Sequence, residues 1–327
     1  MIVITGGAGF IGSNLAAALE ERGEEDIAVC DRLGHDDKWR NLQKRELAAL
    51  VPPEGLFELL RQHARQISTV FHLGAVSSTT ETDADLVVAS NFALSLALWE
   101  WCAANGTRLL YASSAATYGD GAAGFDDDGS PAALARLKPL NAYGWSKHLF
   151  DRRVARLAKM PSRPPQWAGF KFFNVYGPNE YHKGAMKSVA AQIFPRAAKG
   201  EACRLFRSYR PDFADGGQLR DFVYVEDCVA MLLFLYDHPE QSGLFNVGSG
   251  AARSFADLAA AVYRALGREP AIEYVDMPLE LRERYQYRTE ARMDRLHGRG
   301  YNAAPRSLED GVRHYVQTYL AAADPYR

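Results

Sequence analysis

The chain begins with a glycine-spaced turn that joins a strand-like run to a helix-like run. Residues 1–5 are mostly apolar, glycines stand at positions 6, 9 and 12, and residues 11–22 have helical apolar spacing. Glycines at this spacing allow a tight turn, close approach of the backbone to a pyrophosphate, and packing of the helix on the strand. The free N–H groups at the start of such a helix favour an anion. The turn therefore predicts a dinucleotide cradle formed by Gly6, Gly9, Phe10, Ile11 and Gly12.

Strand-like and helix-like segments continue to alternate along the first half of the chain. Further strands are expected at residues 27–30, 69–73, 107–112 and 169–173, and helices at residues 56–65, 83–104 and 143–159. This alternation implies a parallel sheet covered by helices on both faces. We therefore expect an α/β, Rossmann-type doubly wound sheet, with a polar and solvated loop at residues 119–139.

The second half of the chain has longer loops and shorter elements. We expect an NAD(P)-binding domain at residues 1–173, and a smaller α/β domain at residues 174–327 that mainly binds substrate. Apolar segments at 228–236 and 244–247 have core character. Residues near 221–250 are therefore expected to return to the large sheet.

Composition narrows the possible functions. The chain has 47% hydrophobic and 24% charged residues with a formal net charge of -2, which excludes intrinsic disorder and argues against nucleic-acid binding. No run approaches ~20 consecutive apolar residues, and the first residues lack the basic segment of a signal peptide. The four cysteines have no metal-ligand spacing. A cytoplasmic protein without a membrane partner or a structural metal is expected.

The residues after the second expected strand bear on which dinucleotide binds. Asp31 can accept hydrogen bonds from a ribose, which favours NAD, whereas Arg32 and Lys38 can bind a 2′-phosphate, which favours NADP. Both cations could equally form surface ion pairs with Asp36 or Asp37. These residues alone leave NAD and NADP open.

A second set of residues suggests hydride-transfer chemistry. Tyr143 and Lys147 are four residues apart, so a helix places them on one face. An ammonium beside a phenol favours the phenolate and makes it a better base at neutral pH. Ser114 follows the strand at 107–112, at the sheet edge where ligands of doubly wound folds bind. Its hydroxyl can hold the substrate oxygen that Tyr143 deprotonates.

In this order, the glycine turn, Ser114 and the Tyr143–Lys147 pair resemble the extended short-chain dehydrogenase/reductases over nearly the whole chain. Residues 77–81 (Ser-Ser-Thr-Thr-Glu) and 182–184 (His-Lys-Gly) resemble most specifically the nucleotide-sugar epimerases that act on an ADP-linked heptose. This resemblance implies epimerisation at C6 through a ketone, with Tyr143 and Lys183 as acid/base groups and Lys147 anchoring the ribose. Without it, Lys183 would be an ordinary exposed loop lysine.

The resemblance also implies contacts with both ligands. The further cofactor positions are Leu73, Gly74, Ala75, Ser77, Asn91, Val175 and Lys183, and NADP is the expected cofactor, with NAD possible. The substrate positions are Ser114, Asn174, Ala185, Gln192, Phe206, Arg207, Ser208, Tyr209, Arg220 and Tyr285. Ala185 and Gln192 stand where the family often has serine and histidine, and Pro53 replaces a lysine. A homo-oligomer, often a pentamer, is expected.

Three other functions compete with this interpretation. A 4,6-dehydratase needs an acid and a base just after the serine, and Ala115 and Ala116 cannot supply them. A UDP-hexose 4-epimerase would not need Lys183. A redox-inert dinucleotide sensor would be free to lose Tyr143 or Lys147, and this chain has both.

Overall fold

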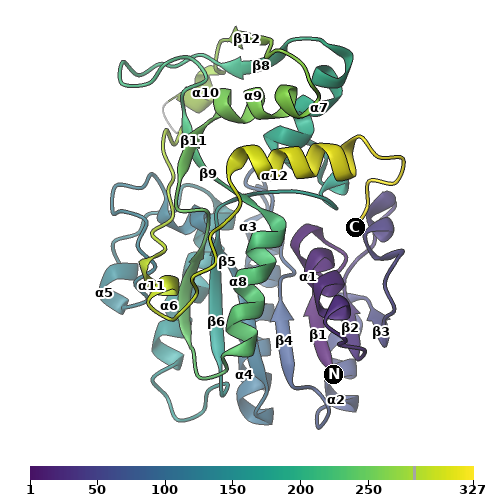
Figure 1. The fold of residues 1–327 in the computed structure, drawn as a ribbon. Helices are drawn as coiled ribbons and strands as arrows, with labels where there is room; N and C mark the ends of the chain where they lie inside the picture. The colour runs from purple at the N-terminus through teal and green to yellow at the C-terminus, as the bar shows by residue number, and fades with distance from the viewer. Residues whose placement is uncertain (283–284) are drawn as a thin grey trace.

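The computed structural model describes residues 1–282 and 285–327, and its main layer is a seven-stranded parallel sheet (Figure 1). The strand order is β10-β6-β5-β4-β1-β2-β3. Chain order reverses between β1 and β4, which opens a crevice at the carboxyl ends of these strands. The expected Rossmann-type fold is confirmed. The strands are β1 (Ile2–Thr5), β2 (Ile27–Cys30), β3 (Ala49–Val51), β4 (Thr69–His72), β5 (Arg108–Ser114), β6 (Trp167–Phe172) and β10 (Gly243–Val247).

Helices cover both faces of this sheet because successive strand side chains point to opposite sides. In β1, Ile2 and Ile4 enter one hydrophobic core and Val3 enters another. The first core lies under α1 (Phe10–Glu21) and α8 (Val225–Asp237). The second lies under the remaining sheet helices, which are α2 (Leu56–Gln62), α4 (Leu94–Asn105) and α6 (Ala142–Leu157).

A smaller group of elements lies at the carboxyl edge of the main sheet (Figure 1). It contains a three-stranded sheet of β7, β9 and β11 and a two-stranded sheet of β8 and β12. Its own core includes Tyr176, Tyr224 and Tyr263. The strands are β7 (Asn174–Tyr176), β8 (Cys203–Phe206), β9 (Leu219–Tyr224), β11 (Ala252–Ser254) and β12 (Ile272–Val275); the helices here and in the connecting segments are α5 (Pro131–Leu134), α7 (Val189–Lys199), α9 (Phe255–Ala265), α10 (Leu279–Arg282), α11 (Asp294–His297) and α12 (Leu308–His314).

The expected solvated loop at 119–139 is wrong in its middle. Asp127 is buried and accepts a hydrogen bond from the backbone N–H of Asn246 in β10, at 2.8 Å. Phe125 packs edge-on against Tyr118. The loop closes over the end of the main sheet because Asp127 and Phe125 form contacts there. The numbers of charged residues and glycines in the loop do not predict these contacts.

The helical run at 84–105 corresponds to the helix expected at 83–104. By length and composition it could cross a membrane, although Asp85, Asn91 and Glu100 interrupt its apolar sequence. The run comprises α3 (Ala84–Val88), a π-helical segment η3 (Ala89–Ala93) and α4. Leu98 and Trp99 of α4 lie in the core beside the main sheet. In this fold the segment is therefore a helix that covers the main sheet. Its other face is not buried by the rest of the chain.

Candidate active site

The glycine turn after β1 shapes the floor of a cavity of about 310 Å³ at the carboxyl edge of the sheet. Gly6 has a φ of +70°, and a Cβ there would lie 2.6 Å from the backbone nitrogen of Gly74. A Cβ on Gly12 would lie 2.2 Å from the carbonyl oxygen of Gly6. Gly9 precedes α1 and has no side chain to cap its first N–H groups. These residues fit a pyrophosphate, because bare backbone and open donors meet at one helix start.

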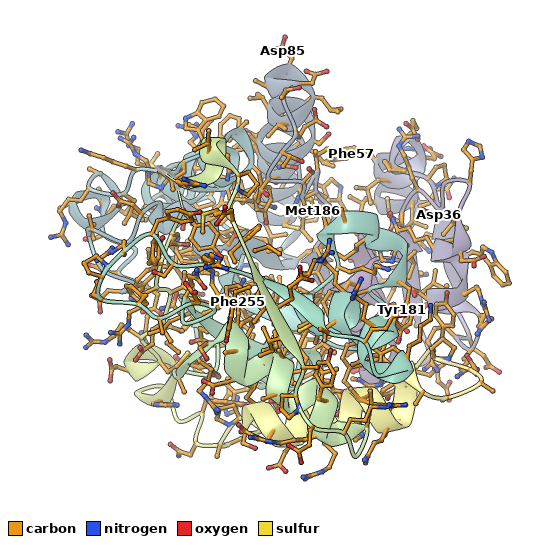
Figure 2. The ribbon with its side chains drawn as sticks, turned by 90° about the horizontal axis from the view of Figure 1, so that it is seen from above. Asp36, Phe57, Asp85, Tyr181, Met186 and Phe255 are labelled. Carbon is orange, nitrogen blue, oxygen red and sulfur yellow. The ribbon has the colours of Figure 1, made fainter. Side chains whose placement is uncertain are left out.

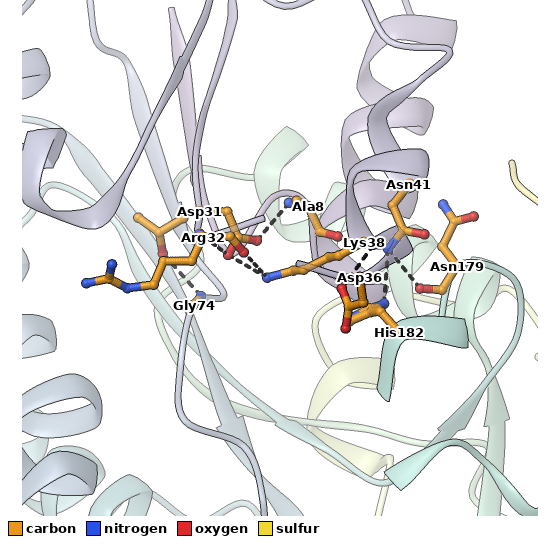
Figure 3. Close-up of polar contacts among 10 residues, drawn as sticks. Ala8, Asp31, Arg32, Asp36, Lys38, Asn41, Gly74, Asn179 and His182 are labelled. Carbon is orange, nitrogen blue, oxygen red and sulfur yellow. Dashed lines mark hydrogen bonds and ion pairs between the residues drawn. The ribbon is translucent and has the colours of Figure 1, made fainter. Parts of the chain in front are cut away.

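Asp31 and Lys38, where the sequence predicts a ribose, line this cavity (Figure 3). Asp31 accepts hydrogen bonds from the backbone N–H groups of Ala8, at 2.9 Å, and of Arg32, at 2.7 Å. The Lys38 ammonium lies 2.7 Å from Oδ1 of Asp31. Arg32 forms an ion pair with Glu54 and does not line the cavity. The side chains of Arg32 and Lys38 therefore do not form the ion pairs with Asp36 or Asp37 that the sequence allowed.

Asn91 lies behind the cavity and holds its wall. Its Oδ1 accepts from the backbone N–H of Val76, and its Nδ2 donates to the carbonyl of Val76 and to Oγ of Ser146. All its amide hydrogens are used, so Asn91 positions the wall formed by 73–77 and presents no donor to a ligand. Leu73, Gly74, Ala75 and Ser77 of this wall do line the cavity, as does Val175 on its opposite side.

The proposed catalytic groups meet at the centre of the cavity. Tyr143 and Lys147 lie on α6, and Ser114 ends β5 and begins the 3₁₀ helix η4 (Ala115–Tyr118). All three line the cavity. Asn141 caps α6 by accepting a hydrogen bond from the N–H of Gly144 at 2.8 Å, which sets where the helix starts. The first turns of α6 thus point at the end of β5.

Burial controls the acidity of these groups. It raises the pKa of the Tyr143 phenol, and the hydrogen bond with Ser114 lowers that pKa in part. The sequence predicts a lowered pKa for Tyr143. In the protein without ligands this prediction is wrong, because desolvation of the phenolate dominates and raises the pKa. Burial also lowers the pKa of Lys147 to about 8, while the charge of Asp151 opposes that shift.

Lys183 reaches the cavity from the smaller group of elements. It lies in the 3₁₀ helix η5 (Tyr181–Met186), and its ammonium is 5.3 Å from the ring centre of Phe10 in the glycine turn. Figure 2 shows η5, labelled at Tyr181 and Met186, between the segment of Asp36 and the start of α9 at Phe255. Burial lowers the pKa of Lys183, and Glu180 opposes the shift. This position suits an amine that exchanges protons.

The loop before η5 is fixed to α1. Nδ2 of Asn14 donates to the carbonyl of Pro178 at 3.0 Å, and Nδ2 of Asn179 donates to Oγ of Ser13 at 3.0 Å. Glu180 is buried and accepts from the hydroxyls of Ser188, at 2.6 Å, and Tyr315, at 3.0 Å. These bonds connect Lys183 to the glycine turn through α1.

A second cavity, of about 360 Å³, lies between α7, β8 and α9. Gln192, Phe206 and Tyr285 line it, together with Phe255 and Gln218. The guanidinium of Arg220 is held beside this cavity, 5.2 Å from the ring centre of Tyr285 and 5.5 Å from that of Phe255. Burial lowers the pKa of Arg220. This region therefore presents aromatic rings beside a guanidinium to a bound ligand.

The other expected substrate residues lie outside both cavities. Arg207 forms an ion pair with Asp276, and the Tyr209 hydroxyl donates to the same carboxylate at 2.9 Å. The hydroxyl of Ser208 donates to the carbonyl of Arg210. Asn174 is exposed on β7, and the carbonyl of Ala185 accepts from Nε2 of Gln192.

Sequence reasoning missed several residues that line the first cavity. His182 faces Lys38 and Lys183 there, and burial together with these cations lowers its pKa to about 4, so it is neutral. It belongs to the His-Lys-Gly motif, whose presence could have identified it. Phe173 and Met186 also line the cavity. Met186 had no signal in the sequence, because it reaches the site only through the bend of η5.

Known proteins match both the chain and its fold. The model of the NAD-dependent epimerase/dehydratase family matches residues 2–248. The ADP-L-glycero-D-manno-heptose-6-epimerase of Nitratidesulfovibrio vulgaris strain DP4 is 49% identical, with all of both chains covered. The crystal structure of the Helicobacter pylori enzyme of that name has a TM-score of 0.77 and 29% identity, covering 97% of this chain and 95% of that one.

A solved structure with a bound dinucleotide is also similar. The UDP-glucose 4-epimerase of Thermus thermophilus, in complex with NAD, has a TM-score of 0.74 and 25% identity over 96% of this chain and 97% of that one. The similarity in fold is therefore not limited to the heptose enzymes. On the matched residues and the full-length similarity, this chain belongs to the NAD-dependent epimerase/dehydratase family.

Proposed function

We propose that this chain epimerises ADP-D-glycero-D-manno-heptose to ADP-L-glycero-D-manno-heptose by oxidation and re-reduction at C6. The observation that carries the proposal is that Tyr143, Lys147, Ser114 and Lys183 line one cavity with the glycine cradle. The names of the most similar relatives support the choice of sugar. Arg220, beside the second cavity, supports a nucleotide diphosphate, because a guanidinium can hold two phosphate oxygens by parallel hydrogen bonds.

A bound nicotinamide dinucleotide would supply the hydride acceptor and donor. Gly6, Gly9 and Gly12 would hold its pyrophosphate, and Lys147 its ribose hydroxyls. Tyr143 would take the proton of the C6 hydroxyl while Ser114 holds the same oxygen. The reverse step places the oxygen on the other side of C6, so a second proton-transfer group is needed. Lys183 lines the same cavity from η5 and would fill that role.

NADP is the dinucleotide we propose, with NAD as the alternative. Both oxygens of Asp31 already accept hydrogen bonds from the protein, so a ribose hydroxyl would compete for them. Lys38 and His182 line the same end of the cavity and can face a 2′-phosphate. Lys38→Met should weaken binding of NADP⁺ more than binding of NAD⁺ in a fluorescence titration, with Lys44→Met as the control. Tighter binding of NAD⁺ by the native chain would contradict this choice.

The decisive experiment incubates the purified chain and its dinucleotide with ADP-D-glycero-D-manno-heptose and resolves the two epimers by chromatography. A mixture of both epimers is expected from either starting epimer, without net consumption of the dinucleotide. Unchanged substrate, or turnover only with a UDP-hexose, would contradict the proposed substrate.

Two further properties are proposed with this function. A homo-oligomer is supported by the apolar run at 84–105, only a third of which is buried within the chain, and by the exposed Trp145 on the neighbouring α6. Light scattering of the purified chain would determine the number of subunits, for which five is expected. A cytoplasmic location is supported by the four cysteines, which are buried and form no disulfide.

A further inference from the structure

A fully buried ion pair lies directly behind the proposed catalytic groups. Asp151 follows Lys147 by four residues and Tyr143 by eight on α6, so all three lie along one side of the helix. The Asp151 carboxylate is 2.8 Å from the ammonium of Lys171 in β6, and neither side chain is more than 1% exposed. Asp151 also accepts from the hydroxyls of Ser113, at 2.7 Å, and Tyr111, at 3.1 Å.

Lys171 extends this contact to the corner that carries Ser114. Its ammonium donates to Oγ1 of Thr117 at 2.7 Å, and the Thr117 hydroxyl donates to the backbone carbonyl of Ser114 at 2.8 Å. The ammonium also lies 4.8 Å from the ring centre of Tyr118. The pair therefore joins α6 to both sides of Ser114, through Ser113 before it and Thr117 after it.

Stability does not account for such a pair. Burying two charges costs about as much as their attraction returns, and apolar residues of similar volume often serve the core equally well. Every hydrogen bond of this network ends instead at α6 or at the residues around Ser114. A network of this kind fixes one relative position of the two elements.

We propose that the Asp151–Lys171 ion pair is a positioning unit that holds Ser114 against the Tyr143 and Lys147 face of α6. The inference rests on the proposed function, because the distance between these three groups matters only if they act on one substrate carbon. Asp151 and Lys171 do not line the cavity, so they act through the residues they hold.

Asp151 has a second effect through its charge. The titratable groups that face it are Lys171 from β6, Tyr111 from β5, Tyr118 from η4, and Lys147 and His148 from α6. Burial raises the pKa values of both tyrosines and lowers that of His148 to about 4, so these three are neutral at pH 7. The charged partners of Asp151 are thus the two lysines, and its carboxylate favours the ammonium form of Lys147.

The first test cuts the link to Ser114 without removing a charge. Thr117→Val keeps the shape of the side chain but loses both hydrogen bonds. We expect kcat for epimerisation to fall about 10-fold, with dinucleotide affinity and KM changing less than about 3-fold. Thr107→Val is the matched control, since Thr107 is equally buried just before the start of β5 but its hydroxyl donates only to the carbonyl of Ile67. Equal kcat values for Thr117→Val and the native chain would overturn the proposal.

The second test removes the charges. Asp151→Asn leaves Lys171 buried without its anion, so the double variant Asp151→Asn/Lys171→Met is measured beside it to separate function from folding. We expect both to lose at least about 10-fold in kcat and to show a lower pKa on the alkaline side of the pH profile, by about one unit in the single variant. A folded double variant with native kcat and a native pH profile would show that the pair is merely structural.

A direct titration separates this inference from the proposed function. The pKa of Lys147 can be followed by NMR of the ¹³C-methylated protein, with Lys147→Arg assigning the signal. Asp151→Asn should lower that pKa by about one unit, whereas Thr117→Val should leave it unchanged. An unchanged pKa in Asp151→Asn would refute the electrostatic part. Inactivity of the native chain toward the heptose would refute only the substrate.

Discussion

The two ends of the active site are built in different ways. At the cofactor end, bare backbone and helix N–H groups after β1 form the cradle, and regular strands hold them in place. At the substrate end, side chains from α7, β8 and α9 surround an apolar cavity, and the loop that follows β8 is long. Under the proposed function, the first end would recognise the dinucleotide through its backbone, whereas the second would select the substrate through side chains.

The largest expected effect lies where the two ends meet. Tyr143→Phe removes the hydroxyl that exchanges the substrate proton but keeps the ring, so turnover should fall by at least ~100-fold. Dinucleotide affinity should stay within a few-fold, because the phenol is only one of many groups at the cofactor end. Steady-state rates with the ADP-heptose and a fluorescence titration with NADP⁺ would measure both. Loss of dinucleotide binding in this variant would show that the two ends are not separable at Tyr143.

A substitution of Lys183, which lines the same cavity from η5, should have a comparable effect. Lys183→Met should also lower turnover by at least ~100-fold, because one of the two proton-transfer groups is lost. Lys187→Met, on the same segment but outside the cavity, should keep near-native rates. Full activity of Lys183→Met would contradict the two-group mechanism and favour a 4-epimerase, for which this lysine is dispensable.

The cofactor end can be damaged by a single methyl group. In Gly12→Ala the added Cβ would lie 2.2 Å from the Gly6 carbonyl oxygen, so the turn must shift. We expect dinucleotide affinity to weaken at least ~10-fold, measured by fluorescence titration or calorimetry. Gly9→Ala is the matched comparison, because its Cβ would meet the same oxygen at 3.0 Å. Equal affinities for Gly12→Ala and the native chain would contradict a cradle that depends on backbone shape.

The substrate end should respond in KM. Arg220→Lys keeps the charge but loses the planar pair of donors, so KM for the ADP-heptose should rise about 10-fold with unchanged dinucleotide affinity. Arg253→Lys is a matched control, since Arg253 lies opposite Arg220 in the β9–β11 pairing and binds Glu309 instead. An unchanged KM would place the diphosphate away from Arg220.

The same contrast explains what the sequence could and could not predict. The glycine turn, the sheet and the Tyr143–Lys147 face follow from local spacing and strand alternation, and the fold was predicted correctly. The Lys183 segment and the Arg220 cavity depended on resemblance, because their residues come together only through loops. Three sequence-based expectations failed for one physical reason. The pKa of Tyr143, the partners of Arg32 and the burial of Asp127 all depend on tertiary neighbours that local sequence does not specify.

The smallest expected effect is that of Asp127. This residue lies in the loop that closes over the end of the main sheet, and it lines neither of the two cavities. Burial raises its pKa from 3.8 to about 6, so the folded state binds a proton more readily than the unfolded state. Its contribution to the free energy of unfolding therefore increases as pH falls from 7 to 5, by roughly 1 kcal/mol. Asp127→Asn should lose this increment in denaturant titrations at the two pH values, whereas Asp128→Asn, at an exposed neighbour, should keep it. If Asp127→Asn and the native chain show the same pH dependence, the carboxylate is solvated and the loop does not close over β10.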